Sequence, residues 1–461
     1  MDGQTNLSGT LIAELQEILG DRFSMADAVR AHHGKDESYH GLTPPDAVVF
    51  PKSTGEVAAI VRVCVRHQTP LIPFGVGTSL EGGIGASHGG VCVDLSGLDC
   101  ILRISAEDMD ATVEAGVTRK RLNTELRDTG LFFAVDPGAD ATLGGMAATR
   151  ASGTNAVRYG TMRHNVLNVK AVLADGRIIS TARRAKKSAA GYDLTGLLVG
   201  SEGTLGIITE VTVRLFGVPQ AVSAAVCSFP TVDDAVGCCI EAIQSNIPVA
   251  RIELLDAVQM DACIRYSKLD YEAAPTLFFE FHGTPDGVKE QAQLVQQIAR
   301  DFGAPDFLWA HRTEDRSALW QARHDALYAA LALKPGTVAW STDCCVPLSK
   351  LSDCIAETRS DIEEAGLLAP IVGHVGDGNF HVIFLIDPDK PAEWEAARRI
   401  NDRMVLRAIE MEGTCTGEHG VGIGKRGYLA AEHGEALDVM RTLKQALDPG
   451  NLMNPGKLLP D

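Results

Sequence analysis

Apolar and polar positions alternate along the first half of the chain in a way that predicts short helices and strands. Leu7 to Leu19 form an amphipathic helical pattern, and a second helix is expected from Ser53, as N-cap in a capping box with Glu56, to about His67. A third is expected over residues 118–129. Strand patterns lie between these helices, at residues 43–51, 70–74, 91–95, 111–114, 166–173 and 177–180. This order of strands and helices indicates an α+β or mixed α/β unit.

The character of the chain changes after Phe216. From Ala221 to about Ala369, strand and helix patterns alternate with fewer glycines, so we place a domain boundary near Val218. A chain of 461 residues also exceeds the size at which one hydrophobic core keeps growing, which predicts two or three domains. The stretch 447–457 is too rich in glycine and proline to form a helix.

The segment from His374 to His381, HVGDGNFH, lies between two apolar, β-prone runs. The runs predict a hairpin, with Asp377-Gly378 as its two-residue turn. Counting outward from that turn, we expect His374 to pair directly with His381. Cross-strand Cβ atoms are about 5 Å apart, so both imidazoles could bind one ion at about 2.1 Å. The pattern therefore predicts that the two histidines share a metal ion.

A later glycine-rich loop, Thr416 to Gly422, adds a carboxylate in Glu418 and a third imidazole in His419. Two histidines and one carboxylate are a common ligand set for a catalytic divalent ion, and such a site keeps an open position for substrate. We expect His374, His381 and Glu418 to be the metal ligands. His419 is then a spare histidine beside them.

Composition and charge limit the range of partners. The formal net charge of −18 argues against nucleic acid or an anionic membrane surface as the main partner. The 11 cysteines lack the Cys-x-x-Cys spacing of a cluster, which favours reduced thiols in the cytosol. No signal or transit pattern opens the sequence, and no apolar run reaches the roughly 18 residues of a membrane span. We expect a cytoplasmic enzyme, or one held peripherally to the inner membrane.

Four loops combine glycine with serine, threonine or asparagine, at residues 75–83, 137–145, 152–155 and 200–206. Glycine lets the backbone approach a ligand with its N–H groups, and hydroxyls add donors for phosphate oxygens. Four such loops indicate one extended, phosphate-bearing cofactor. Leu80 occupies the third glycine position of the dinucleotide fingerprint, and residues 422–425 lack the P-loop spacing, so Rossmann and ATP sites are disfavoured.

Four motifs together resemble the FAD-linked D-2-hydroxy acid dehydrogenases of the vanillyl-alcohol oxidase and p-cresol methylhydroxylase superfamily, most of all the cytochrome-linked D-lactate dehydrogenases. The motifs are PFGVGTSLEGG (73–83), GSEGTLGIIT (200–209), HVGDGNFH (374–381) and GEHGVGIGK (417–425). The resemblance runs in order from Asp46 to Lys457. It implies an α+β fold in three parts: an FAD-binding domain (1–217), an α+β substrate or cap domain carrying the metal site (218–435), and a C-terminal segment returning to the FAD domain (436–461).

The resemblance also implies which residues hold a noncovalent FAD. The flavin pyrophosphate and ring would be lined by Pro73, Gly75, Gly77, Thr78, Ser79, Leu80, Pro137, Gly138, Thr142, Gly144, Gly145, Ser152, Gly153 and Asn155. The adenine half would contact Glu202, Gly206 and Ile208, and Asn454 would lie on the isoalloxazine side.

The reaction implied by the resemblance is oxidation of a D-2-hydroxy acid to the 2-oxo acid, with FAD as hydride acceptor. A zinc or manganese ion would polarise the substrate hydroxyl, and His419 would take its proton. Arg323 matches the arginine that grips the substrate carboxylate. Ser341 stands where relatives acting on 2-hydroxyglutarate place a lysine, which favours a monocarboxylate such as D-lactate.

Electrons should leave the reduced flavin for an external cytochrome, quinone or electron-transfer flavoprotein, because the cysteines offer no internal cluster relay. D-2-Hydroxyglutarate and glycolate remain alternative substrates, and a homodimer is compatible with the sequence. Two other classes stay open. A metal-dependent hydrolase would use the same ligands but leave the glycine loops without a purpose, and a flavoprotein subunit could relay electrons with a vestigial metal site.

Overall fold

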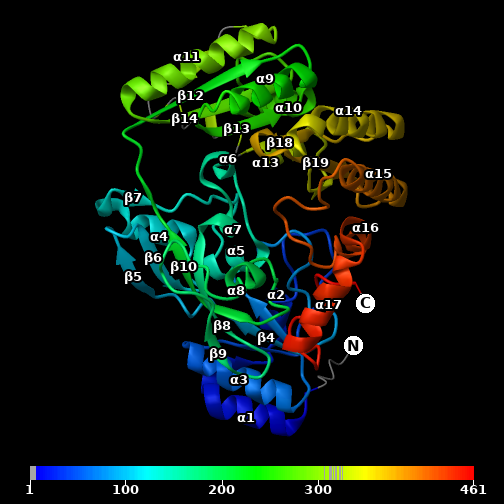
Figure 1. The fold of residues 1–461 in the computed structure, drawn as a ribbon. Helices are drawn as coiled ribbons and strands as arrows, with labels where there is room; N and C mark the ends of the chain where they lie inside the picture. The colour runs from blue at the N-terminus through cyan, green and yellow to red at the C-terminus, as the bar shows by residue number, and fades with distance from the viewer. Residues whose placement is uncertain are drawn as a thin grey trace. The chain divides into compact units, whose positions relative to one another are not determined.

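The structure, a computed structural model, describes residues 7–305, 307–310, 314, 316, 319–320, 323 and 325–460. The chain divides into two compact units (Figure 1). The first unit comprises residues 1–152, 160–218 and 418–461, and the second comprises 153–159 and 219–417. The FAD-binding and substrate-binding ranges expected from the sequence stay a prediction.

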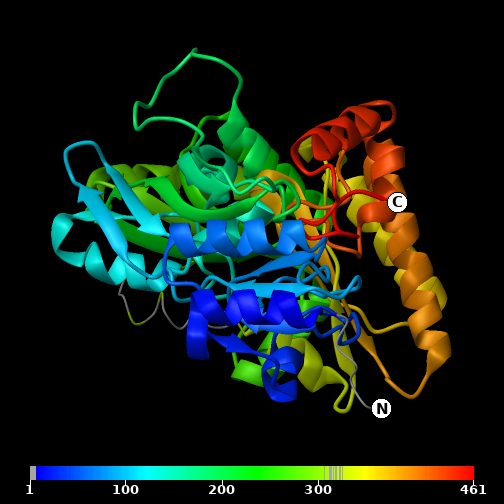
Figure 2. The same cartoon turned by 90° about the horizontal axis from the view of Figure 1, so that it is seen from below.

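The first unit opens with a small sheet in the order β1-β2-β4-β3, in which β2 and β3 run parallel to β4. Helices α1 and α3 lie side by side against it (Figures 1 and 2). The strands are β1 (Phe23–Ser24), β2 (Ala47–Val49), β3 (Leu71–Phe74) and β4 (Val91–Asp94), and the helices are α1 (Gly9–Leu19), η1 (Gly20–Arg22), α2 (Asp27–His32) and α3 (Thr54–Arg66). A core of α1 leucines, α3 valines and strand residues such as Leu71 holds these elements together.

Ser53 caps α3 as the sequence predicts, because its side chain accepts from the backbone N–H of Glu56. The second half of the predicted capping box is wrong. The Glu56 carboxylate accepts from the backbone N–H of Lys52 at 2.7 Å and pairs with Arg22. Arg22, 34 residues away in the sequence, binds the Glu56 carboxylate through two nitrogens, and this bidentate pair replaces the capping-box bond to the backbone of Ser53.

A second sheet of the first unit is antiparallel, in the order β5-β6-β10-β8-β9, and β7 pairs separately with β11. The helix expected over 118–129 is split into an α-helix and a 3₁₀ turn, and a helix begins inside the glycine stretch at Leu143. The elements are β5 (Ile101–Ser105), β6 (Asp110–Glu114), α4 (Arg119–Glu125), η2 (Arg127–Thr129), β7 (Leu131–Phe132), α5 (Leu143–Thr149), α7 (Met162–Asn165), β8 (Val166–Val172), β9 (Ile178–Ser180), α8 (Leu194–Leu198), β10 (Ile207–Arg214) and β11 (Phe216–Gly217).

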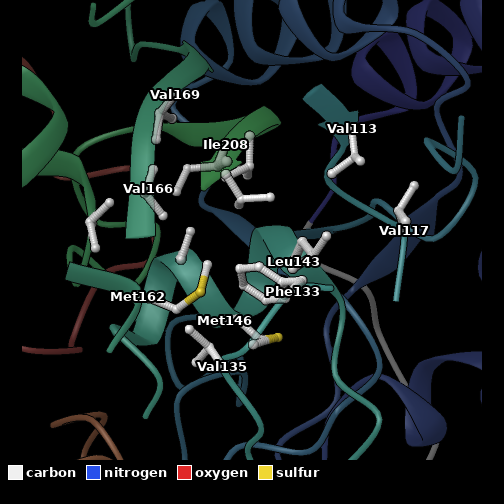
Figure 3. Close-up of a cluster of buried hydrophobic side chains, with 14 of the residues drawn as sticks. Val113, Val117, Phe133, Val135, Leu143, Met146, Met162, Val166, Val169 and Ile208 are labelled. Carbon is white, nitrogen blue, oxygen red and sulfur yellow. The ribbon is translucent and has the colours of Figure 1, made fainter. Parts of the chain in front are cut away.

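The core beneath this sheet fixes α5 in place. Figure 3 shows Leu143 and Met146 of α5 gathered with Phe133 beside the side chains of Val166 and Ile208. Burying aliphatic and aromatic groups of this size stabilises each by about 1.5–3 kcal/mol. The glycine-rich segment before α5 is thereby attached to a rigid layer.

The C-terminal segment, residues 418–461, completes the first unit with η4 (Arg426–Tyr428), α16 (Leu429–His433) and α17 (Ala436–Leu447). Its last residues lie beside β3. Leu71 forms a parallel bridge with Met453, and the backbone N–H of Asn454 donates to the carbonyl of Leu71 at 2.8 Å. The segment therefore ends against the strand that leads into the first glycine loop.

The second unit is built on an eight-stranded sheet in the order β15-β12-β14-β13-β18-β19-β16, with β17 pairing β19. Figure 1 shows its helices, green to orange, around these strands. Its elements are α6 (Ala156–Tyr159), β12 (Ala221–Ser228), α9 (Val232–Gln244), β13 (Val249–Leu255), α10 (Ala257–Ser267), β14 (Thr276–Gly283), α11 (Pro285–Asp301), β15 (Leu308–Ala310), α13 (Ala326–Leu333), β16 (Val338–Ser341), β17 (Cys344–Cys345), α14 (Leu348–Ala365), β18 (Ile371–His374), η3 (Val375–Asp377), β19 (Asn379–Ile386) and α15 (Pro391–Glu410).

Candidate functional site

The histidine hairpin is present, but its register differs from the expected one. His374 pairs with Asn379, and His381 pairs with Val372. The predicted two-residue turn is wrong, because residues 375–377 form a 3₁₀ turn and Gly378 closes the loop at φ 78°. A Cβ atom at Gly378 would lie 2.0 Å from the carbonyl oxygen of Val346, so only glycine fits this turn.

The longer turn moves the pairing by two positions and leaves the two histidines on one face of the hairpin. Side chains alternate faces with a period of two, so a shift of two keeps both rings on the same side. The rings are diagonal neighbours with centroids 5.3 Å apart and planes at 80°. The expected juxtaposition of His374 and His381 is therefore confirmed, although the reason for it is different.

His374 is oriented by a buried carboxylate that the sequence analysis missed. Its Nδ1 lies 2.7 Å from Oε1 of Glu253, which can only accept, so Nδ1 carries a proton and a metal ion would be bound by Nε2. In β13, Leu254 pairs with Gly373, which sets Glu253 level with His374 in the adjacent strand. An acid in the middle of the apolar strand VARIELL is a signal that sequence analysis could have used.

Glu253 also holds Arg323. The Nε and Nη2 atoms of Arg323 lie 3.0 and 2.7 Å from Oε2 of Glu253, whose side chain is fully buried. Burial raises the pKa of Glu253, but the opposing interactions with His374 and Arg323 are larger and leave the pKa below its usual value. Glu253 is thus an ionised carboxylate between a predicted metal ligand and the predicted carboxylate-binding arginine.

His381 is oriented in the same way by a backbone acceptor. Its Nδ1 lies 2.9 Å from the carbonyl oxygen of Thr342, so Nε2 carries the lone pair. The amide of Asn379, turned so that its nitrogen donates to Asp343 Oδ1 at 2.9 Å and to the Cys344 carbonyl at 2.7 Å, brings its other amide atom, the oxygen, to 3.3 Å from His381 Nε2. Two lone pairs facing each other in a buried place fit a shared cation.

Glu418 follows Gly417, the last residue of the second unit, and joins the two histidines. Ligand atoms of His374, His381 and Glu418 all lie within 4.8 Å of one another. The loop before Glu418 is held by Thr416, whose hydroxyl donates to Asp343 at 2.6 Å. This set of nitrogens and one carboxylate has the donor chemistry of a zinc or manganese site.

His419 belongs to the first unit, where its ring is buried with Nδ1 3.8 Å from Oε1 of Glu81. The backbone of the following residues is fixed by Glu202. The Glu202 carboxylate accepts from the N–H groups of Val421 at 2.6 Å and Gly422 at 2.8 Å. Burial raises the pKa of Glu202, and the two backbone donors offset part of that effect. The loop that carries His419 is therefore rigid.

Several predicted cofactor residues of the first unit lie at a backbone crossing, the place where the segments around Gly75, Thr142, Glu202 and Asn454 meet. Thr142 caps α5 and is so close to Gly75 that a Cβ there would lie 2.6 Å from its hydroxyl. Asn454 donates from Nδ2 to the carbonyls of Gly83 at 3.1 Å and Glu202 at 2.7 Å. Three of the glycine-rich segments and the C-terminal segment thus meet in one place.

This crossing has buried polar atoms that suit a large polar cofactor. Among the described residues, Asn454 Oδ1 and Ser201 Oγ are buried without a hydrogen-bond partner. Such atoms cost free energy unless a ligand or water completes them. Together with the exposed backbone of Gly138, next to which a Cβ would meet nothing within 4 Å, they fit a large polar cofactor such as FAD.

The remaining predicted positions fall in both units. In the first unit, Pro73 lies in β3, Ile208 in β10 and Ser152 after α5, and the loop after β3 carries Gly77, Thr78, Ser79 and Leu80; Pro137 and Gly138 precede α5, Gly144 and Gly145 form its first turn, and Gly206 precedes β10. Ser79 donates to Asp36 at 2.7 Å. Gly153 and Asn155 lie in the second unit, where Asn155 Oδ1 accepts from Arg251 at 2.8 Å. Their predicted contacts with FAD stay predictions.

Two further sequence predictions concern substrate and membrane. Ser341 ends β16 and pairs with Ile383 of β19, the second strand of the hairpin that carries His374 and His381. Within the described ranges, none of the helices is long and apolar enough to cross a lipid bilayer.

Comparison with known proteins gives matches over nearly the whole chain. Residues 45–182 match the family described as FAD binding domain, and residues 218–458 match the family described as FAD linked oxidases, C-terminal domain. A Danio rerio protein named probable D-lactate dehydrogenase, mitochondrial, is 54% identical over 97% of this chain and 91% of its own. An Arabidopsis thaliana D-lactate dehydrogenase [cytochrome], mitochondrial, is 48% identical over 98% of this chain and 80% of its own.

A more distant relative, glycolate oxidase subunit GlcD of Bacillus subtilis, is 33% identical over 96% of both chains. Among solved structures, p-cresol methylhydroxylase with substrate bound superposes with a TM-score of 0.79 at 15% identity, over 98% of both chains. An alkyldihydroxyacetonephosphate synthase superposes with a TM-score of 0.78 at 20% identity, over 99% of this chain and 87% of that one. These likenesses confirm the expected α+β fold of the vanillyl-alcohol oxidase type.

Proposed function

The chain belongs to the FAD-linked oxidases, and from that membership we propose that it is an FAD-dependent dehydrogenase of D-2-hydroxy monocarboxylates, with D-lactate as the favoured substrate. Relatives of 54% and 48% identity that carry the name D-lactate dehydrogenase support this substrate class. The single observation that carries the chemistry is the histidine pair, in which both Nδ1 atoms face acceptors and ligand atoms of both rings lie within 4.8 Å of one another and of Glu418.

The residues proposed to hold FAD are the glycine-loop positions around Thr142, the Glu202 loop and Asn454. When bound there, FAD would accept the hydride from the substrate carbon. The protein's own contribution is a preformed crossing of backbone segments, tied by Asn454 to the carbonyls of Gly83 and Glu202. A metal-dependent hydrolase would leave this crossing and the FAD-binding match over residues 45–182 without a purpose.

The residues proposed to hold the divalent ion are His374, His381 and Glu418. A zinc or manganese ion in that place would act as a Lewis acid toward the substrate hydroxyl. Glu253 and the Thr342 carbonyl fix the two rings before any ion binds, because each accepts from an Nδ1. Such acceptors set the tautomer and the ring orientation of a ligand histidine.

Two side chains complete the proposed reaction. His419 takes the hydroxyl proton on a ring nitrogen, in a loop that Glu202 holds rigid. Arg323 binds the substrate carboxylate through its guanidinium, of which Nη1 is not used by Glu253. Ser341 brings no second cation toward the substrate, so a dicarboxylate such as D-2-hydroxyglutarate would be held less well. Reoxidation by an external cytochrome, quinone or electron-transfer flavoprotein completes the cycle.

Anaerobic reduction of the bound flavin tests this function. The purified protein should show flavin absorbance, and D-lactate should bleach it in the absence of oxygen, with pyruvate formed in equal amount. L-Lactate serves as the matched control. A protein without flavin absorbance would overturn the proposal in favour of the hydrolase, and a flavin that no D-2-hydroxy acid bleaches would favour the electron-relay subunit.

A further inference from the structure

We propose that Glu253 is a positioning residue that joins the metal-binding and carboxylate-binding halves of the substrate site. Its two oxygens divide between His374 and Arg323, with Oε1 2.7 Å from His374 Nδ1 and Oε2 2.7 Å from Arg323 Nη2. The inference rests on the proposed function and names a residue through which it operates. Glu253, His374 and Arg323 all belong to the second unit, and Glu253 and His374 lie in adjacent strands of its sheet.

The position of Glu253 is fixed more firmly than that of either partner. It lies in β13, between β14 and β18, with Cα partner Phe278 in β14. Its side chain is fully buried, whereas the His374 side chain is 11% and the Arg323 side chain 12% exposed. A carboxylate in the middle of a sheet has little freedom, and it transfers that rigidity to the two groups that it binds.

A 2-hydroxy acid carries its carboxylate and its hydroxyl on neighbouring carbons. A site for it must therefore hold the carboxylate-binding cation and the hydroxyl-binding ion at one fixed separation. A single carboxylate that accepts from both Arg323 and His374 sets that separation directly. Misplacement of about 1 Å in such a constellation can cost about 100-fold in rate.

A second buried carboxylate in the same sheet has the same kinds of partner but does not belong to the cluster of candidate metal ligands. Glu280 of β14 also faces a histidine and an arginine, with Oε1 2.8 Å from His282 Nε2 and 3.5 Å from Arg251 Nε. The other nitrogen of His282, Nδ1, is 2.8 Å from the hydroxyl of Tyr159. Both ring nitrogens of His282 thus have protein partners, whereas His374 directs Nδ1 to Glu253 and contributes a ligand atom to the cluster with His381 and Glu418.

The variant E253Q separates positioning from folding. Glutamine has nearly the same shape, but only one of its two terminal atoms can accept, so either His374 or Arg323 faces an amide N–H. After chelation and retitration of the flavin-loaded protein with Zn²⁺ or Mn²⁺, we expect metal affinity about 10–100-fold weaker than in the wild type. The KM for D-lactate should rise at saturating metal, because a neutral amide holds Arg323 less firmly than the carboxylate does.

E280Q is the matched control, since it makes the same change in a buried carboxylate with the same kinds of partner. Its metal affinity should equal that of the wild type. An E253Q protein that keeps flavin absorbance, wild-type metal affinity and wild-type KM would overturn the inference. If the wild type itself binds neither ion, or D-lactate fails to bleach its flavin, the proposed function fails instead.

A second measurement is made on the wild type and does not depend on the folding of E253Q. Histidine labelled with ¹⁵N reports the tautomer of each ring, and H374Q identifies the signals of His374. Protonation of the metal-free ring at Nδ1 is expected, because Glu253 can only accept there. Protonation at Nε2 alone would overturn the role assigned to Glu253.

Discussion

His374 and His381 are diagonal neighbours on one face of the β18–β19 hairpin, with ring centroids 5.3 Å apart. Each ring directs Nδ1 to an acceptor, Glu253 for one and the Thr342 carbonyl for the other. The pair is therefore oriented before a metal ion arrives.

Replacement of either hairpin histidine should remove the metal and leave the flavin. H381N deletes the ring that packs beside Asn379, and we expect metal affinity to fall by about 100-fold or more, since one of three protein ligands is lost. Metal content after dialysis measures the effect, and flavin absorbance checks the fold. H433N is the control, because His433 of α16 is half-buried and lies outside the candidate ligand cluster. Stoichiometric metal in H381N would contradict the ligand assignment.

His419 should matter for turnover and not for binding. In H419A the proposed base is missing, so kcat should fall by about 10²–10⁴-fold while metal and FAD remain bound. Steady-state kinetics with D-lactate, combined with metal and flavin content, provide the measurement. A variant with normal kcat would remove His419 from the mechanism.

Asn454 should stabilise the flavin-binding crossing. N454A leaves the buried carbonyls of Gly83 and Glu202 without their donor, which should cost about 1–3 kcal/mol of stability for each carbonyl left without a partner. Weaker FAD retention and a lower Tm are expected, measured by flavin release on dilution and by thermal unfolding. Unchanged retention would show that the C-terminal segment does not contribute to the cofactor site.

Lys457 predicts a pH dependence of stability. Burial lowers the pKa of Lys457 to about 8, partly opposed by the Glu202 charge, against an ordinary value of 10.5. Between these two values the unfolded chain binds more protons than the folded one, so this residue contributes increasing stability as pH rises from about 8 to 10.5. Below pH 8 the folded protein bears the cost of the buried charge.

The free energy of unfolding, measured in urea at several pH values for the wild type and K457M, tests that sign. The difference between the two proteins should move in favour of the wild type above pH 8, with a slope of at most about 1.4 kcal/mol per pH unit. A difference that stays flat or moves the other way would contradict the lowered pKa.

Ser341 should limit the charge of the substrate. The wild type should turn over D-lactate better than D-2-hydroxyglutarate, and S341K should shift the ratio of the two kcat/KM values toward the dicarboxylate by adding a cation. S341A is the matched control and should leave the ratio near that of the wild type. Preference of the wild type for D-2-hydroxyglutarate would contradict the proposed substrate class.

The sequence by itself determined what depends on neighbouring residues or on a spacing. Ser53 caps α3 because capping needs only a side chain three residues before an N–H, and the glycine-rich segments are recognisable because they are contiguous. The sequence also predicts that the two histidines share one face, and this holds although the turn and the register differ, since a period of two tolerates a shift of two.

Only the tertiary structure decided the contacts between distant strands. Glu253 lies 121 residues from His374 and 70 from Arg323, and nothing in the local pattern of β13 states which groups its carboxylate will meet. The His374 partner follows from the order of strands in the sheet, which places β13 beside β18. Strand order is a property of the whole packed unit, because it is fixed by the burial of many side chains at once.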